Sequence, residues 1–173
     1  MQTSPRIKII LVEDNDLIRQ ITTSMLARFG FEVITLDGPL GFGRALLKER
    51  PSLALVDVSM PGLQGDQLVE VTNQQRAGKI CPIVLFSDRT EADLSALAKA
   101  CGADGFICKS HRWPDIARSI NKYIGQHTAS LRGERFVGFN QIEILHGPAG
   151  LLQRLARCRD RACAHHGRIN ARG

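Results

Sequence analysis

Carboxylates follow two short apolar segments of the chain. Glu13 and Asp14 come directly after the apolar segment at residues 7–12, and Asp57 follows the segment at residues 53–56. Three carboxylates held close together would raise one another's pKa values unless a cation compensated their charge. Mg²⁺ is the simplest such cation, because it takes oxygen ligands, including one or two carboxylates, and leaves room for a phosphoryl oxygen. These residue types therefore indicate a magnesium site if the fold brings the two segments together.

Two further polar residues indicate what such a site could do. Ser87 ends a third apolar segment, and Lys109 follows a fourth. A carboxylate such as Asp57 can act as a nucleophile towards phosphorus, as in aspartyl-phosphate enzymes. Mg²⁺, the hydroxyl of Ser87 and the ammonium of Lys109 would then neutralise charge on the phosphoryl oxygens. A Met-Pro-Gly turn at residues 60–62 would lead the chain away from Asp57.

Five short apolar segments, which have the pattern of strands, alternate with five helical patterns along the first 126 residues. The predicted strands are residues 7–12, 31–36, 53–57, 82–87 and 104–108. The predicted helices are residues 16–29, 40–50, 64–77, 90–101 and 114–124, the last ending before Gly125. Nearly continuous apolar strands that alternate with helices are typical of a parallel sheet covered on both faces. We therefore predict an α/β fold with a five-stranded, doubly wound, flavodoxin-like parallel sheet in the order 2-1-3-4-5.

This strand order brings the polar residues together. The first and third strands become neighbours at the point where the winding reverses, and ligands bind there, beyond the carboxyl ends of the strands. The carboxylates, the hydroxyl and the ammonium described above all follow strands at this edge. Each carboxylate alone could equally be a helix cap or a turn residue. Their joint placement at strand ends favours a site.

Four sequence pieces resemble the receiver domain of two-component response regulators. They are VEDN at residues 12–15, VDVSMPGLQGD at 56–66, FSD at 86–88 and FICKS at 106–110. The pieces occur in the family's order, and the resemblance covers about residues 6–125. One such piece would be weak evidence, whereas four in register are specific.

The resemblance implies an aspartyl-phosphate site with Mg²⁺ as its cofactor. Asp57 would be the phospho-acceptor. Glu13 and Asp14 would hold Mg²⁺ together with Asp57 and the main-chain carbonyl of Ser59. The metal would then lie between the acceptor and the incoming phosphoryl group.

The resemblance also implies a conformational switch. Ser87 would be the hydroxyl that moves towards the phosphoryl group, Phe106 the aromatic side chain that turns inward with it, and Lys109 the partner of the phosphate. Two residues depart from the family's pattern. Ser110 stands where a proline usually follows the lysine, which puts a cis peptide bond there in doubt. Asp88 replaces the small residue that commonly follows the switch hydroxyl, and its charge could change the lifetime of the phosphorylated state.

These features predict a signalling switch that is not an enzyme beyond its own phosphotransfer and dephosphorylation. Its partners would be a histidine kinase or phosphotransfer protein and a downstream protein effector. Two alternatives stay open: a DNA-binding transcriptional regulator that uses the C-terminal tail, and a receiver-like interaction module that works without phosphorylation. The sequence also leaves open whether the chain forms a homodimer.

The basic charge of the chain lies in its C-terminal part. Residues 1–126 hold 15 Lys and Arg against 14 Asp and Glu, whereas residues 127–173 hold 8 against 3. We predict a receiver domain at 1–126 and a basic tail at 127–173, with one amphipathic helix at 150–164. Only this tail could bind nucleic acid.

Two weaker motifs do not fit a zinc site or a dinucleotide site, and the apolar runs do not fit a membrane protein. The tail's Cys158, Cys163, His165 and His166 do not have the spacing of a standard structural zinc site. The segment GPLGFGRAL at residues 38–46 lacks the third glycine of a dinucleotide-binding fingerprint and follows the second strand. No apolar run approaches the roughly 18 residues of a membrane helix, and the N-terminus lacks the pattern of a signal peptide. We therefore expect a cytoplasmic protein.

Overall fold

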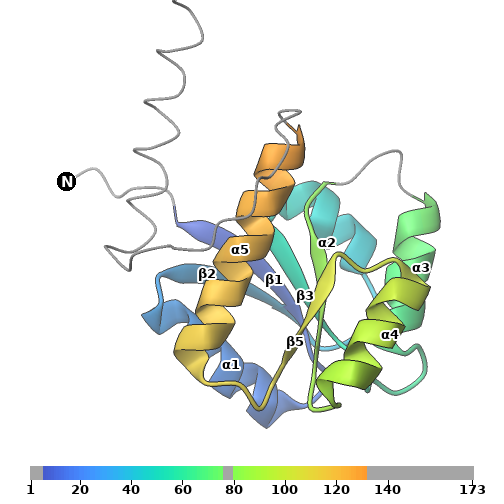
Figure 1. Ribbon diagram of the computed structural model, residues 1–173, viewed down its shortest axis with the longest axis horizontal. Coiled ribbons are helices and arrows are strands. Elements are labelled where there is room, and N and C mark those ends of the chain that lie inside the picture. The colour runs from blue at the N-terminus through green and yellow to red at the C-terminus, as the bar shows by residue number, and fades with distance from the viewer. Residues whose placement is uncertain (1–5, 76–79, 132–173) are drawn as a thin grey trace, which may run out of the picture. The chain divides into compact units, whose positions relative to one another are not determined.

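Five parallel strands form one sheet in the order β2-β1-β3-β4-β5 (Figure 1). The computed structural model describes residues 6–75 and 80–131. Its strands are β1 (Ile7–Val12), β2 (Phe31–Leu36), β3 (Leu53–Asp57), β4 (Ile83–Ser87) and β5 (Gly105–Cys108). The predicted flavodoxin-like order is therefore confirmed. The first three strands have the predicted bounds, and β4 and β5 each begin one residue later.

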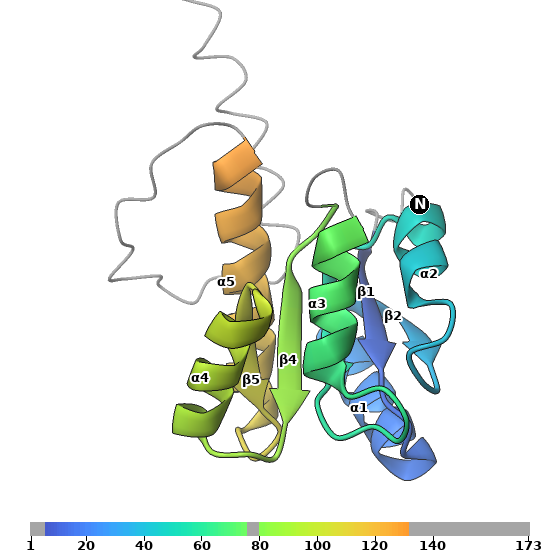
Figure 2. The same ribbon diagram turned by 90° about the vertical axis from the view of Figure 1, so that its right-hand side faces the viewer.

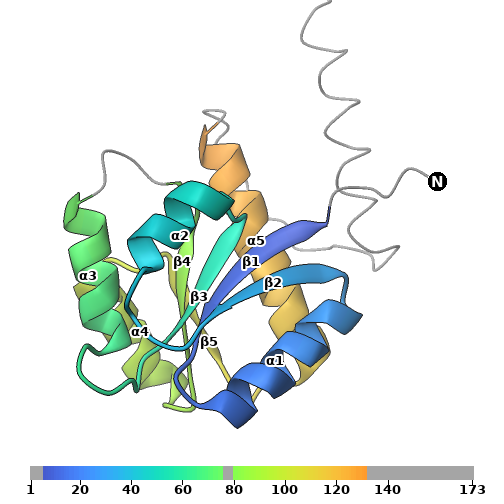
Figure 3. The ribbon, with the colours of Figure 1, turned by 180° about the vertical axis from the view of Figure 1, so that it is seen from behind.

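Helices cover both faces of this sheet. In the described part of the chain they are α1 (Asp16–Arg28), α2 (Phe42–Glu49), α3 (Gly65–Gln75), α4 (Glu91–Cys101) and α5 (Trp113–Leu131). Helices α1 and α5 lie on one face, and α2, α3 and α4 lie on the other (Figure 1 and Figure 3). This two-sided cover explains why the central strands are apolar apart from Lys8 in β1 and the strand-end residues Asp57 and Ser87.

Alternation of side chains along the strands creates two separate cores. In β1, Ile9 and Leu11 pack towards α1 and α5, whereas Ile10 and Val12 pack towards α2, α3 and α4. Every residue of β3 and β4 is buried. A one-residue shift of a strand would exchange the two sets of side chains, so both cores fix the register. The positions of the residues at the strand ends are fixed with it.

The carboxyl ends of the strands meet at one edge of the sheet (Figure 2). Helices begin close behind two of these ends. The side chain of Asn15 accepts a hydrogen bond from the main-chain N–H of Ile18 and caps α1. The hydroxyl of Thr90 accepts one from the N–H of Asp93 and caps α4. These caps confine the connections after β1 and β4 to a few residues.

The last helix differs from the prediction. Helix α5 continues through Gly125 to Leu131, so the prediction that it ends at Ile124 is wrong. A glycine inside a helix costs about 1 kcal/mol relative to alanine, but buried Ile120 and Ile124 hold the helix against the sheet. The hydroxyl of Thr128 also donates a hydrogen bond to the carbonyl of Ile124 across the glycine. Packing therefore overrides the local stop signal.

Most of the basic tail lies outside the described residues. Residues 127–131 belong to α5. The predicted amphipathic helix at 150–164 and the cysteines and histidines of the tail fall in the part that is not described, and the division of the chain at residue 126 stays a prediction. Among the described residues, no helix combines the length and apolar character needed to span a bilayer.

Candidate functional site at the carboxyl edge of the sheet

Three charged side chains from three strand ends meet at this edge. Lys109, directly after β5, places its ammonium 2.6 Å from an oxygen of Glu13 and 3.0 Å from an oxygen of Asp57. Glu13 follows β1 and Asp57 ends β3, and β1 and β3 pair side by side. Both carboxylates are buried, with exposed fractions of 1% and 4%. Sequence positions far apart are thus joined in one buried ionic cluster.

Asp14 completes a set of carboxylates that can hold a metal ion. Oxygens of Glu13, Asp14 and Asp57 all lie within 4.8 Å of one another. A single ammonium cannot neutralise three carboxylates, so the set retains negative charge for a divalent cation. Its donors are all oxygens, which matches the preference of Mg²⁺. The residues present therefore fit a magnesium site, as the sequence pattern indicates.

Burial and charge act against each other on this cluster. Burial raises the pKa of Glu13 above its ordinary value, although the hydrogen bond and charge of Lys109 partly oppose that shift. Burial by itself would lower the pKa of Lys109, but the hydrogen bonds and charges of Glu13 and Asp57 together raise it. Lys109 is therefore held as an ammonium. It also lies 5.6 Å from the centre of the Phe86 ring, at the distance of a cation–π contact.

Ser87 lies on β4, the strand next to that of Asp57, and Phe106 lies on β5, one strand further out. Ser87 is buried at the end of β4, and its main-chain carbonyl accepts a hydrogen bond from the N–H of Lys109. Phe106, in β5, is half-buried and packs against the core under α4. The hydroxyl of Tyr123 in α5 holds its main chain from both sides, donating to the Phe106 carbonyl and accepting from its N–H.

The remaining predicted residues surround this cluster. Ser59 lies two residues after Asp57 and is exposed. Asp88 is also exposed, directly after Ser87. No peptide bond in the described ranges is cis, so the bond between Lys109 and Ser110 is trans. Serine in place of proline removes the usual reason for a cis bond at that position.

Two residues that the sequence analysis did not single out shape the site. The guanidinium of Arg19 in α1 donates hydrogen bonds to the main-chain carbonyls of Glu13 and Asp14. At the start of α3, a side-chain carbon at Gly65 would overlap the main-chain carbonyl of Asp57. Arg19 therefore holds the main chain of Glu13 and Asp14 in place, and Gly65 leaves space for the main-chain carbonyl of Asp57. Neither has a local sequence signal, because both act through contacts made by the fold.

Comparison with known proteins identifies the family. A family model described as the response regulator receiver domain matches residues 9–121. The chain belongs to this family. Receiver domains of this kind act in two-component signalling, so the sequence-based resemblance is confirmed.

Named relatives show both long and short proteins with this domain. The receiver is 33% identical over 135 residues to the transcriptional regulatory protein CseB of Streptomyces coelicolor, an alignment that covers 78% of this chain and 56% of CseB. It is 24% identical over 128 residues to protein PilG of Pseudomonas aeruginosa, covering 73% of this chain and 94% of PilG. The chain thus spans only about half the length of CseB.

Solved structures support the same assignment. The chemotaxis protein CheY4 of Vibrio cholerae superimposes with a TM-score of 0.62 at 25% identity, covering 69% of this chain and 99% of CheY4. The fold of this chain is therefore that of a receiver domain.

Proposed function

We propose that this receiver accepts a phosphoryl group on Asp57 from a histidine kinase or a phosphotransfer protein. The observation that carries the proposal is the cluster at the sheet edge. A buried carboxylate lies 3.0 Å from the ammonium of Lys109, and within 4.8 Å of the other carboxylate oxygens of the metal set. A carboxylate buried at the end of an apolar strand is costly without such partners, and the cluster provides them. Its surroundings suit a nucleophile that attacks phosphorus.

The residues of the cluster divide the chemistry between them. An oxygen of Asp57 forms a bond to phosphorus while the bond from phosphorus to the donor breaks. Lys109 can move its hydrogen bond from Asp57 to a phosphoryl oxygen, while Glu13 keeps the ammonium in place. Glu13, Asp14, Asp57 and the main-chain carbonyl of Ser59 would hold Mg²⁺. When bound, Mg²⁺ supplies positive charge that offsets the charge developing on the phosphoryl oxygens.

Phosphorylation would be read out through β4 and β5. Ser87 follows Phe86, which pairs in register with Asp57, so the Ser87 hydroxyl belongs to the strand next to the acceptor. We propose that this hydroxyl moves to a phosphoryl oxygen and that the half-buried ring of Phe106 turns inward. The two positions then act as one two-state element that the phosphoryl group biases. A downstream protein would recognise the altered surface, so the chain acts as a switch and not as an enzyme.

A second candidate function involves nucleic acid. CseB is named a transcriptional regulatory protein, and the proposed tail at residues 127–173 carries 8 basic residues against 3 acidic ones. In this alternative, the proposed receiver at residues 1–126 controls DNA binding by the tail. Binding would then weaken steeply with salt and disappear when the chain is cut after Leu131, where α5 ends. PilG is aligned over 94% of its length, so a relative can consist of little more than the part that matches this chain.

The direct test adds beryllofluoride, which mimics an aspartyl phosphate, together with Mg²⁺, and follows amide resonances of the full chain. We expect shifts near Asp57, Ser87, Phe106 and Lys109 that require both additions. Asp57→Asn should abolish them, because it removes the acceptor charge with little change in shape. Glu32→Gln, at an exposed acid of β2, is the matched control and should respond like the wild type. An unchanged spectrum of the wild type would favour the module that works without phosphorylation.

A further inference from the structure

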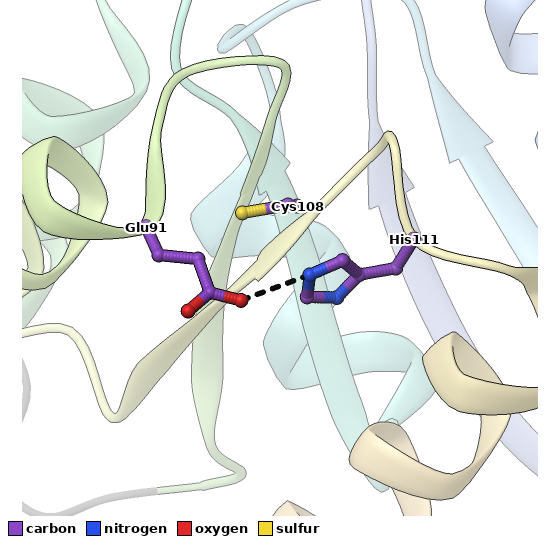
Figure 4. Close-up of side chains that lie close together, drawn as sticks. All are labelled: Glu91, Cys108 and His111. Carbon is purple, nitrogen blue, oxygen red and sulfur yellow. Dashed lines mark hydrogen bonds and ion pairs between the residues drawn. The ribbon is translucent and has the colours of Figure 1, made fainter.

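Three potential metal ligands meet outside the magnesium cluster. Glu91 is the first residue of α4, Cys108 ends β5, and His111 lies in the connection from β5 to α5. One donor atom from each lies within 4.8 Å of the other two. Nε2 of His111 is 3.0 Å from a carboxylate oxygen of Glu91. Figure 4 shows the three side chains turned towards one another, with the thiol beside the carboxylate–imidazole pair.

The donor set is unlike that of the magnesium cluster. A thiolate, an imidazole and a carboxylate are the ligands that zinc-type ions prefer, whereas Mg²⁺ takes oxygen donors. Zinc with these ligands is tetrahedral, with bonds of about 2.0 to 2.3 Å, which puts neighbouring donor atoms roughly 3.5 Å apart. Glu91 is exposed and His111 is partly exposed. Their side chains can therefore rotate by the small amount needed to close the set around one ion.

Charge around the thiol also favours a cation. Cys108 carries a free, buried thiol whose Sγ lies 3.6 Å from the main-chain carbonyl of Arg89. Burial raises the pKa of this thiol, and the negative charges of Glu91 and Asp88 raise it further. The nearby ammonium of Lys109 pairs with Glu13 and Asp57 at the other cluster. A bound divalent ion would relieve the local negative charge and replace the thiol proton.

We propose that Glu91, Cys108 and His111 form a second metal site that binds Zn²⁺. On binding, the proton of the Cys108 thiol passes to solvent, and the charges of the thiolate and the carboxylate balance the two charges of the ion. Three protein ligands leave the fourth tetrahedral position to water or to a donor from a partner. The proposal does not depend on phosphorylation of Asp57.

The proposed metal site lies beside the residues of the proposed switch. Cys108 precedes Lys109 in the chain and pairs in register with Ser87 across β4 and β5. Glu91 stands four residues after Ser87, at the other end of the β4–α4 connection. A bound ion would therefore tie the start of α4 to the end of β5. It would restrict the segments on either side of Ser87 and Lys109.

The test must separate this site from the cysteines and histidines of the tail. The background is a full chain with Cys158→Ser, Cys163→Ser, His165→Gln and His166→Gln, prepared free of metal. Co²⁺ serves as the spectroscopic probe, because a cobalt–thiolate bond gives a charge-transfer absorption, and Zn²⁺ then displaces it. With excess Mg²⁺ present to occupy the acidic cluster, we expect one Co²⁺ per chain with one thiolate ligand, and we expect Zn²⁺ to displace it.

Variants identify the ligands. Cys108→Ser should abolish the cobalt–thiolate band, while Cys101→Ser, at another buried thiol, should leave it unchanged. Glu91 is exposed and His111 is partly exposed, so we expect His111→Gln and Glu91→Gln to fold, and each should weaken Zn²⁺ binding tenfold or more. Asp57→Asn should bind Zn²⁺ like the background, which separates this proposal from the proposed phosphorylation. Absence of the band in the background, or its persistence in Cys108→Ser, would overturn the proposal.

Discussion

The ammonium nitrogen of Lys109 lies 2.6 Å from a carboxylate oxygen of Glu13, a residue 96 positions earlier in the chain. The same ammonium contacts Asp57, and the Lys109 side chain is only 12% exposed. Removing one partner from a buried ionic cluster leaves the charges of the other partners unneutralised in the protein interior. The cation therefore stabilises the fold as well as preparing the site.

Lys109→Met tests this double role. We expect a loss of about 3 kcal/mol in the free energy of unfolding in metal-free buffer, because two buried carboxylates lose their cation. Urea unfolding measures this free energy, and adding Mg²⁺ should restore part of the lost stability. Lys48→Met, at an exposed lysine that pairs with Glu49, should change stability by less than about 0.5 kcal/mol. An equal effect of the two substitutions would contradict the buried-cluster interpretation.

Gly65→Ala probes the space behind the acceptor. The added carbon would overlap the carbonyl of Asp57, so β3 or α3 must shift, and we expect a cost of about 1–3 kcal/mol. Gly125→Ala is the matched control, since an added carbon there meets nothing within 4 Å. That substitution should stabilise α5 by roughly 0.5–1 kcal/mol. Thermal unfolding measures the stability of both variants. Beryllofluoride binding measures whether the site at Asp57 is still formed.

The single tyrosine of the chain offers a pH-dependent test. Burial raises the pKa of Tyr123 above its ordinary value of 10.0, although the hydrogen bond with Phe106 partly opposes that shift. Tyrosinate absorbance should therefore show a higher pKa in the native chain than in urea. The unfolded chain loses its proton first as pH rises. The stability that neutral Tyr123 contributes is thus complete below about pH 10 and is lost as pH rises through the native pKa.

Tyr123→Phe supplies the comparison for that titration. The variant should lack this part of the alkaline loss in the free energy of unfolding while keeping the part due to Lys109, whose pKa is also raised. It should also loosen the main chain at Phe106, because the donor and acceptor on the tyrosine hydroxyl disappear. Faster amide exchange at Phe106 would reveal that change. Identical alkaline unfolding curves for variant and wild type would show that the phenol does not contribute.

Arg19→Met tests the support of the acidic pair. Its guanidinium donates to the carbonyls of Glu13 and Asp14 at 2.8 and 3.3 Å. Without it, the two carboxylates are held less firmly, and we expect Mg²⁺ to bind several-fold more weakly, in line with the loss of a residue that orients metal ligands. Calorimetric titration with Mg²⁺ measures the affinity. Arg118→Met removes a surface pair with Asp115 in α5 and should leave the affinity unchanged.

The strands and the acidic cluster were predictable because their signals are local. Apolar runs mark β1, β2 and β3 at their observed bounds, and the runs of β1 and β3 lead directly to Glu13 and Asp57. The parallel order then brings those ends to one edge, so Glu13, Asp57 and Lys109 could be grouped before any coordinates. Their roles as metal ligands, acceptor and phosphate partner remain predictions for experiment.

The features that the sequence missed depend on contacts between distant segments. Gly125 reads as a helix stop, but burial of Ile124 carries α5 past it. Gly65 resembles any loop glycine until the carbonyl of Asp57 is placed beside it. Glu91, Cys108 and His111 have no recognisable spacing, since three different elements deliver them. Packing, and not composition, decides each of these cases.

The sheet order has a consequence for when the ionic cluster can form during synthesis. Each parallel pairing requires a crossover, and β1 and β3 pair although β2 and α2 lie between them in the sequence. Such non-local contacts form slowly. A nascent chain that ends before β5 carries Glu13 and Asp57 but lacks Lys109. The ionic cluster of Glu13, Asp57 and Lys109 can therefore form only after β5 and Lys109 have been synthesised.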